Sequence, residues 1–326
     1  MPSYPAAGAE RDRFVVDLRG PRPRHDAWRY HDVSVEDERD ADGQVARVAT
    51  VFLTGRECPW RCVMCDLWRH TIEDDTPAGA IPSQVKAARR VLDERGDAVT
   101  QMKLYNAGSF FDPRAVPEAD YGAVADALAG LDRVIVESHP SLVGPRVDRL
   151  LEALDAPLEV AMGLETAHPA ALERLHKRMS VETFAAAASR LAERGVALRV
   201  FLLISPPFVP PDEQDTWLLR SIERAFSSGA SVVSLIPTRP GNGAMESLAA
   251  QGHFRPPEMH DIERSVEIAL ANMPPRGRIF VDLWDLEQFT ECPHCTAGRR
   301  ARLHRINLEQ RALPAFSCDQ CMSMPT

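Results

Sequence analysis

The stretch Val48-Ala-Thr-Val-Phe-Leu-Thr-Gly-Arg-Glu-Cys58-Pro-Trp-Arg-Cys62-Val-Met-Cys65 indicates both the fold and the chemistry. Its first part is a nearly continuous apolar run that ends at Thr54-Gly55, as expected for a strand buried on both faces. Its second part places three cysteines directly after that strand. Because the loops that follow strands carry the chemistry of such folds, we expect a metal site there.

Outward from this stretch, apolar runs alternate with helical segments along most of the chain. Such alternation predicts a parallel sheet with helices outside it, curled by right-handed crossovers into a full or partial barrel. A doubly wound open sheet is the alternative, and ligands bind at the carboxyl ends of the strands in both. The expected strands cover residues 48–53, 99–105, 133–137, 158–164, 196–204, 231–236 and, just before the last cysteines, 278–283. The expected helices cover residues 81–95, 117–129, 145–154, 181–194, 212–227 and 259–272.

Composition excludes several classes of protein. The 326 residues carry a formal net charge of −9, so the charge of the whole chain does not favour nucleic acid as a ligand. No apolar run approaches the roughly 18 residues that span a bilayer. The first residues lack the basic flank and apolar core of a secretory signal. We therefore predict a cytoplasmic protein with no membrane partner.

The seven cysteines form a triplet, Cys58, Cys62 and Cys65, and two C-x2-C pairs. This grouping argues against a disulfide framework and favours two separate metal centres. Thiolates hold iron–sulfur clusters, and three of them leave one iron of a four-iron cluster open. A structural zinc site needs four ligands, and His70 is the conceivable fourth. The triplet therefore predicts a 4Fe–4S cluster, with zinc as the alternative.

The spacing C-x3-C-x2-C resembles that of the radical S-adenosylmethionine (SAM) superfamily. The resemblance implies that SAM binds the open iron and is cleaved, by one electron, to methionine and a 5′-deoxyadenosyl radical. It also implies an electron donor such as flavodoxin or ferredoxin, and SAM contacts at the ends of the following strands. The candidates for these contacts are Asn106, Gly108 and Ser109 after the second strand, Glu137 and Ser138 after the third, and Glu165 after the fourth.

These candidates also have purely structural interpretations. Asn106 and Gly108 belong to a run of ordinary turn formers. Either glutamate can be an ion-pair partner of Arg178 or Arg199. The two interpretations make different predictions about which side chains meet at the end of the barrel.

A closer resemblance, covering residues 48 to 260, is to the archaeosine-synthase radical SAM subunit (RaSEA) and its bacterial relatives. It implies action on tRNA, where the family member cleaves a lysine adduct of a 7-deazaguanine base. The sequence departs from that pattern at Ser205, where the family carries lysine, and at residues 176–179, His-Lys-Arg-Met, where it carries Asn-Lys-Gly. The segments that carry the resemblance are Gly108–Arg114, Val136–Pro140, Gly163–Thr166 and Leu202–Phe208.

Three hypotheses follow for the function. The first is a radical SAM enzyme, a lyase or a transferase, that acts on a modified nucleoside of tRNA. The second is the same radical chemistry on a small metabolite or a peptide. The third is a non-catalytic metal-binding or RNA-binding protein whose cysteines only hold structure.

The C-terminal segment contains the pairs Cys292/Cys295 and Cys318/Cys321, separated by 22 residues. Four thiolates satisfy tetrahedral zinc, so a zinc-ribbon-like module is predicted, with an auxiliary iron–sulfur cluster as the alternative. The residues between the pairs are basic, which suits either a tRNA backbone or docking on the acidic barrel. They are Arg299, Arg300, Arg302, His304, Arg305 and Arg311.

The predicted architecture is thus an α/β protein. Its core is a partial (β/α)6 TIM-like barrel of the radical SAM type, with a small C-terminal four-cysteine metal-binding appendage. The expected parts are an N-terminal arm at residues 1–45, the core barrel at 46–240, an extension packed on the barrel at 241–290 and the four-cysteine module at 291–326.

Overall fold

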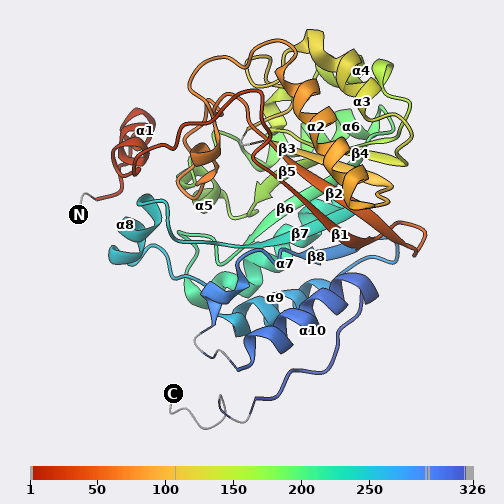
Figure 1. Ribbon diagram of the computed structural model, residues 1–326. Helices are drawn as coiled ribbons and strands as arrows, with labels where there is room; N and C mark the ends of the chain where they lie inside the picture. Colours follow the sequence, from red (N-terminus) through yellow and green to blue (C-terminus); the bar gives the residue numbers. More distant parts are fainter. Residues whose placement is uncertain (1–2, 107, 291, 293, 319, 321–326) are drawn as a thin grey trace.

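The computed structural model describes residues 3–106, 108–290, 292, 294–318 and 320. Its strands form one eight-stranded sheet in the order of the sequence, with helices packed around it (Figure 1). The first two strands are antiparallel, and every later neighbouring pair is parallel. The strands are β1 (Asp32–Arg39), β2 (Val45–Leu53), β3 (Gln101–Asn106), β4 (Arg133–Glu137), β5 (Leu158–Glu165), β6 (Ala197–Ile204), β7 (Val232–Pro237) and β8 (Arg278–Val281).

The sequential strand order confirms the predicted partial barrel and excludes the doubly wound alternative, in which the strand order reverses. Helical crossovers join the parallel strands from β2 to β8, and the predicted strand at 278–283 is β8, which adds a seventh parallel strand to the six of the predicted barrel. The helices are α1 (Gly8–Asp17), α2 (Ala80–Arg95), α3 (Tyr121–Ala127), α4 (Pro145–Ala153), α5 (Pro169–Arg174), α6 (Val181–Ala192), α7 (Gln214–Ser227), α8 (Ala244–Ala250), α9 (Met259–Ala271) and α10 (Thr296–Glu309).

The main core lies between the sheet and its helices. In β5, for example, Leu158, Val160 and Met162 belong to this core, whereas Glu159 between them faces the interior of the barrel. Period-two alternation of this kind places charged side chains inside the barrel without interrupting the apolar outer layer. Among the described residues, no helix is both long and apolar enough to cross a membrane.

The amino end of the barrel is filled by a buried ion network. Arg199 donates to Glu159 at 2.7 Å and to Glu38 at 2.9 Å, and Lys103 also donates to Glu38. Burial alone would raise the pKa of Glu38, but the charges of Arg199 and Lys103 hold it well below its usual value. The network uses four acidic and four basic side chains, so its charges balance: Glu36, Glu38, Asp40, Glu159, Lys103, Arg133, Arg199 and Arg278.

This network explains why β1 is missing from the sequence prediction. The strand reads Asp-Val-Ser-Val-Glu-Asp-Glu-Arg, with only two apolar residues, because Glu36 and Glu38 reach into the barrel toward Lys103. A charged inward face removes the apolar pattern by which a strand is recognised. The predicted boundaries at residues 45, 240 and 290 remain predictions.

The open edge of the barrel at β8 is covered by α10, which packs against both β8 and β1. The side-chain amide of Asn307 accepts from the backbone N–H of Val281 and donates to its carbonyl oxygen, both at 2.9 Å. Gln310 does the same to Ile279, at 2.8 Å in each direction. Two side-chain amides thereby take the place of a neighbouring strand, which satisfies backbone groups that an edge strand would expose.

Candidate functional site

The cysteine loop leaves the carboxyl end of β2 and is tied to the loops that follow other strands. The amide of Val63 donates to the carbonyl oxygen of Leu175 at 3.0 Å. The side-chain amide of Asn242, after β7, donates to the carbonyl oxygens of Val63 and Cys65 at 2.8 and 3.3 Å. The loop position is therefore set by the barrel mouth, as the sequence predicted.

The three thiols of the loop are spaced too widely for a single ion. Among the described residues, three ligand atoms of cysteine, histidine, aspartate or glutamate lie within 4.8 Å of one another only in the C-terminal segment, not at Cys58, Cys62 and Cys65. A tetrahedral zinc ion at about 2.3 Å from each sulfur needs sulfurs roughly 3.8 Å apart. The triplet is free of disulfides. This spacing favours a larger group, such as a cluster, over zinc.

Burial keeps the triplet protonated until metal arrives. It raises the pKa of each thiol, of Cys58, Cys62 and Cys65, to about 12. Iron or zinc binds the thiolate, so loading must release a proton from each cysteine. Loading is therefore coupled to proton release at this site.

Arginines from the N-terminal segment surround the residue that precedes the triplet. Arg19 donates to Glu57 at 2.8 Å, and Arg22 and Arg61 also pair with this carboxylate. Burial works to raise the pKa of Glu57, but the hydrogen bonds from Arg19 and Arg22 hold it below its usual value. The segment that follows α1 is thus fastened directly to the start of the cysteine loop.

An aromatic stack joins the cysteine loop to the end of β4. Trp60 lies parallel to His139, with ring centroids 3.8 Å apart and an interplanar angle of 13°. Burial, with the nearby Lys177, lowers the pKa of His139 to about 4, so the ring is neutral at pH 7. Its Nε2 lies 2.9 Å from the carbonyl oxygen of Lys177, which can only accept, so this nitrogen carries the proton. Trp60 and His139 thereby hold the backbone of Lys177 beside the loop.

The predicted SAM-contacting residues after β3 include one side chain without a partner. Asn106 is 5% exposed, and neither its Oδ1 nor its Nδ2 has a hydrogen-bond partner in the described structure. A buried amide without partners is costly, so its presence at a strand end suits a ligand. At Gly108, a β-carbon would lie 3.4 Å from that of Cys58, so the absent side chain leaves space beside the first thiol.

The two predicted serines contact each other. Ser109 Oγ lies 3.1 Å from Ser138 Oγ, and Ser138 also donates to the carbonyl oxygen of His139. Both residues are buried. These bonds join the loops after β3 and β4, and SAM binding by either hydroxyl stays a prediction.

Glu137 ends β4 with its carboxylate inside the barrel mouth. Its Oε2 accepts from the backbone amide of Asn106 at 3.2 Å. Burial raises the pKa of Glu137 to about 8, so the group is largely protonated at neutral pH. A protonated carboxyl can donate a hydrogen bond to a ligand oxygen as well as accept one.

Glu165 has a partner that the sequence interpretation did not name. Lys177 donates to Glu165 Oε1 at 2.5 Å, whereas Arg178 pairs with Asp12 and Arg199 with Glu38 and Glu159. The alternative that paired Glu165 with an arginine is therefore wrong. Glu165 has a φ of 65°, a conformation that costs about 1–3 kcal/mol in a residue other than glycine. Such strain is concentrated at functional sites.

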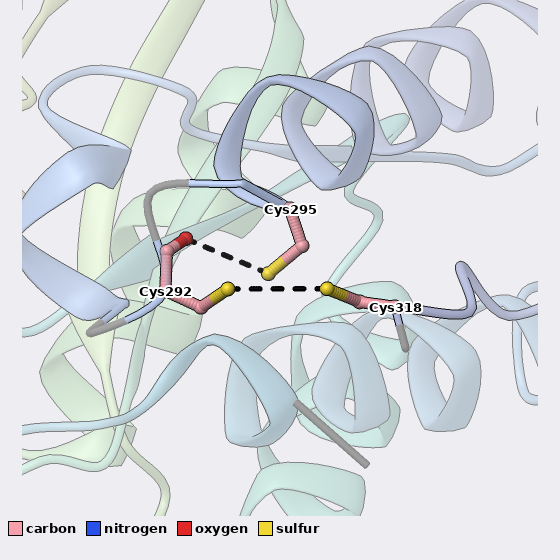
Figure 2. A group of neighbouring side chains, drawn as sticks. All are labelled: Cys292, Cys295 and Cys318. Carbon is pink, nitrogen blue, oxygen red and sulfur yellow. Dashed lines mark hydrogen bonds between the residues drawn. The ribbon is translucent and has the colours of Figure 1, made fainter. Parts of the chain in front are cut away.

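The C-terminal cysteines gather at the start of α10 (Figure 2). The sulfurs of Cys292 and Cys318 are 3.9 Å apart, and Cys292 and Cys295 are buried. Ligand atoms within 4.8 Å of one another fit a single ion, in contrast to the triplet. The fourth predicted ligand, Cys321, lies outside the described residues. The segment between the cysteine pairs begins with the helix α10.

The arginines of α10 and its flank all have acidic partners. Arg302, with a side chain 5% exposed, pairs with Glu263 and Glu267 of α9, and Arg299 also pairs with Glu263. Arg300, Arg305 and Arg311 pair with Glu287 or Glu309 and keep side chains 50–62% exposed. Arg299 and Arg302 therefore dock the helix on the barrel, and the other three are available to solvent.

Comparison with solved structures identifies the class of fold. A radical SAM methyltransferase from Sphaerobacter thermophilus superposes with a TM-score of 0.53 and 20% sequence identity. The match covers 84% of this chain and 81% of that one. The chain therefore has the barrel of the radical SAM type, with the cysteine loop after its first parallel strand.

Two relatives are similar in sequence. The archaeosine synthase subunit beta of Methanosarcina acetivorans is 25% identical over 244 residues, which are 72% of this chain and 70% of that one. An uncharacterized protein of Methanocaldococcus jannaschii is 23% identical over 263 residues, which are 77% of this chain and 72% of that one. No family model matches the sequence. The first relative confirms the resemblance to the archaeosine-synthase radical SAM subunit that the motifs predicted.

Proposed function

We propose that this protein is a radical SAM enzyme that acts on a modified nucleoside of tRNA. The observation that carries the proposal is the position of Cys58, Cys62 and Cys65 at the carboxyl end of β2, in a barrel of the radical SAM type. A 4Fe–4S cluster held there supplies, when reduced, the electron that cleaves SAM to a 5′-deoxyadenosyl radical. An electron donor such as flavodoxin or ferredoxin would reduce it in the cytoplasm.

We infer that different residues at the mouth of the barrel contact different groups of SAM. The unpaired amide of Asn106 and the space beside Gly108 suit a polar group placed next to Cys58. Glu137, protonated at neutral pH, suits a hydroxyl or a carboxylate oxygen. Glu165, held by Lys177, offers a carboxyl oxygen to a donor such as the SAM amino group.

The substrate class rests on the relative whose printed name is archaeosine synthase subunit beta. That name also leads us to propose a partner subunit. If tRNA contacts the C-terminal module, the exposed Arg300, Arg305 and Arg311 are the side chains placed to meet phosphate. We propose zinc for the cysteines of that module because three of their ligand atoms gather around one point.

The enzymatic proposal is tested with protein reconstituted anaerobically with iron and sulfide. With dithionite and SAM, it should release 5′-deoxyadenosine, and Cys62→Ala should not. If a well-assembled cluster releases none, with or without tRNA, the cysteines have a non-catalytic role. Metal analysis should find about four iron atoms and one zinc per chain, whereas about eight iron atoms and no zinc would make the C-terminal site an auxiliary cluster.

The substrate is tested by mass spectrometry of nucleosides from the tRNA of cells with and without the protein. Loss of a modified nucleoside, restored by the wild-type chain but not by Cys62→Ala, supports the proposal. An unchanged nucleoside profile would direct the search to a small metabolite or a peptide.

A further inference from the structure

Lysine is rare in this chain and is placed unusually. Of its 38 basic residues, three are lysines: Lys86, Lys103 and Lys177. Lys86 is exposed on α2, whereas Lys103 belongs to the ion network at the amino end of the barrel. Lys177 is buried at the opposite end, where its ammonium donates to Glu165 Oε1 at 2.5 Å and to the carbonyl oxygen of Gly163 at 2.7 Å. In the described structure, two of the three N–H donors of this ammonium thus have an acceptor, and the third has none.

The backbone around Lys177 is fixed to the cysteine loop on both sides. Leu175, two residues before it, accepts from the amide of Val63, which lies between Cys62 and Cys65. The carbonyl oxygen of Lys177 itself accepts from His139, and His139 stacks on Trp60 of the same loop. These contacts tie the backbone at Leu175 and Lys177 to the loop that carries Cys58 and Cys62.

The outer side of this segment is held by α1. Asp12 accepts from His176 Nε2 at 2.9 Å and from the guanidinium of Arg178. His176 and Arg178 flank Lys177, and both have a left-handed backbone conformation, with φ of 59° and 55°. This alternation directs the lysine inward while its neighbours face α1. The contacts with Asp12 therefore stabilise the conformation that directs the ammonium toward the interior of the barrel mouth.

We propose that Lys177 is a positioning residue whose fixed positive charge raises the reduction potential of the cluster bound by the triplet, while Glu165 opposes it. The inference rests on the proposed function, since it requires the cluster. One-electron reduction by an external reductant takes the cluster core from a charge of 2+ to 1+, which adds one negative charge beside Cys58 and Cys62. In a poorly solvated site, a nearby ammonium stabilises that charge and a nearby carboxylate destabilises it.

The test compares the midpoint potentials of reconstituted variants, followed by electron paramagnetic resonance during a reductive titration. Lys177→Met should lower the equilibrium constant for reduction at least about tenfold, which is about 59 mV for a one-electron couple. Glu165→Gln should shift the potential in the opposite direction. Lys177→Arg should restore the wild-type value to within about 20 mV, a twofold change in the constant. Lys86→Met, which removes the same charge from the surface, should leave the potential unchanged.

The possible outcomes separate this inference from the proposed function. Wild-type protein that assembles no cluster contradicts the proposed function. Clusters that assemble in wild type, Lys177→Met and Glu165→Gln with equal midpoint potentials overturn the role of Lys177 and leave the proposed function intact. If Lys177→Met does not fold, Glu165→Gln provides the test by itself. A purely structural role for the ion pair predicts no rise in the midpoint potential of the cluster in that variant.

Discussion

The two ends of the barrel are formed by the same strands but differ in how their inward side chains are paired. At the amino end, four acidic and four basic groups balance around Glu38 and Arg199. At the carboxyl end, Asn106 has an amide without partners, Glu137 is protonated at neutral pH, and Glu165 is in a strained conformation. The first arrangement closes the barrel, whereas the second keeps polar groups available for a ligand.

Cys62→Ala should have the largest effect at the carboxyl end. Two thiolates cannot hold a four-iron cluster with one open iron, so we expect complete loss of the cluster absorbance and of 5′-deoxyadenosine release. The metal of the C-terminal site should remain, because its thiols gather at the start of α10 and share no residue with the triplet.

Cys295→Ala is the matched control for this prediction. It should lose the C-terminal metal and retain the cluster absorbance. Loss of both metals from either variant would contradict the two independent centres.

Arg199→Met should have the largest effect on stability at the amino end. The substitution leaves Glu38 and Glu159 buried without their main partner, which costs about 3–5 kcal/mol of unfolding free energy. Chemical denaturation of the metal-free protein measures it. Arg90→Met, at an exposed position of α2, should change stability by less than about 0.5 kcal/mol. Equal effects of the two substitutions would mean that the network contributes little to stability.

Gly163→Ala tests the crowding around the ion pair of Glu165 and Lys177. A β-carbon at this position would overlap Glu165 Oε1 and Lys177 Nζ, so the pair must move. We expect a loss of about 1–3 kcal/mol in stability and weaker SAM binding, measured by calorimetry. The control is Gly122→Ala in α3, where nothing lies within 4 Å of the added carbon. If both substitutions are neutral, the ion pair is mobile enough to adapt.

Glu137→Gln should act through the pH dependence of stability and change stability little at pH 5. The pKa of Glu137 is about 8 in the folded chain and about 4.3 when unfolded. Between these two pKa values, the folded state therefore binds one more proton than the unfolded state. The stabilisation from this group is present below pH 4 and is lost as pH rises toward 8. Glutamine does not titrate, so the variant should lose less stability between pH 5 and pH 8, by about 3 kcal/mol. Parallel pH profiles of the two metal-free proteins would contradict the raised pKa.

The sequence predicted the carboxyl end of the barrel better than the amino end. The predicted helix 81–95 is α2, Ala80–Arg95, and the predicted helix 145–154 is α4, Pro145–Ala153, because both carry amphipathic patterns with clear ends. The triplet was recognisable because its ligands are adjacent in sequence. Lys177 was not recognised as a site residue, since its role depends on Glu165, His139 and Trp60, which lie in other segments. Pairing across segments of this kind leaves no local pattern.

The cover that α10 provides for β8 has a consequence for the solubility of the chain. Asn307 and Gln310 occupy backbone groups of β8 that would otherwise be free to recruit a strand from another molecule. The helix that carries them begins next to Cys295, so we expect oxidation of the C-terminal thiols or removal of a bound metal to loosen its first turn. The amides that cover β8 lie at the opposite end of the helix, so strand pairing at β8 is expected only in preparations where the loosening extends along the whole of α10.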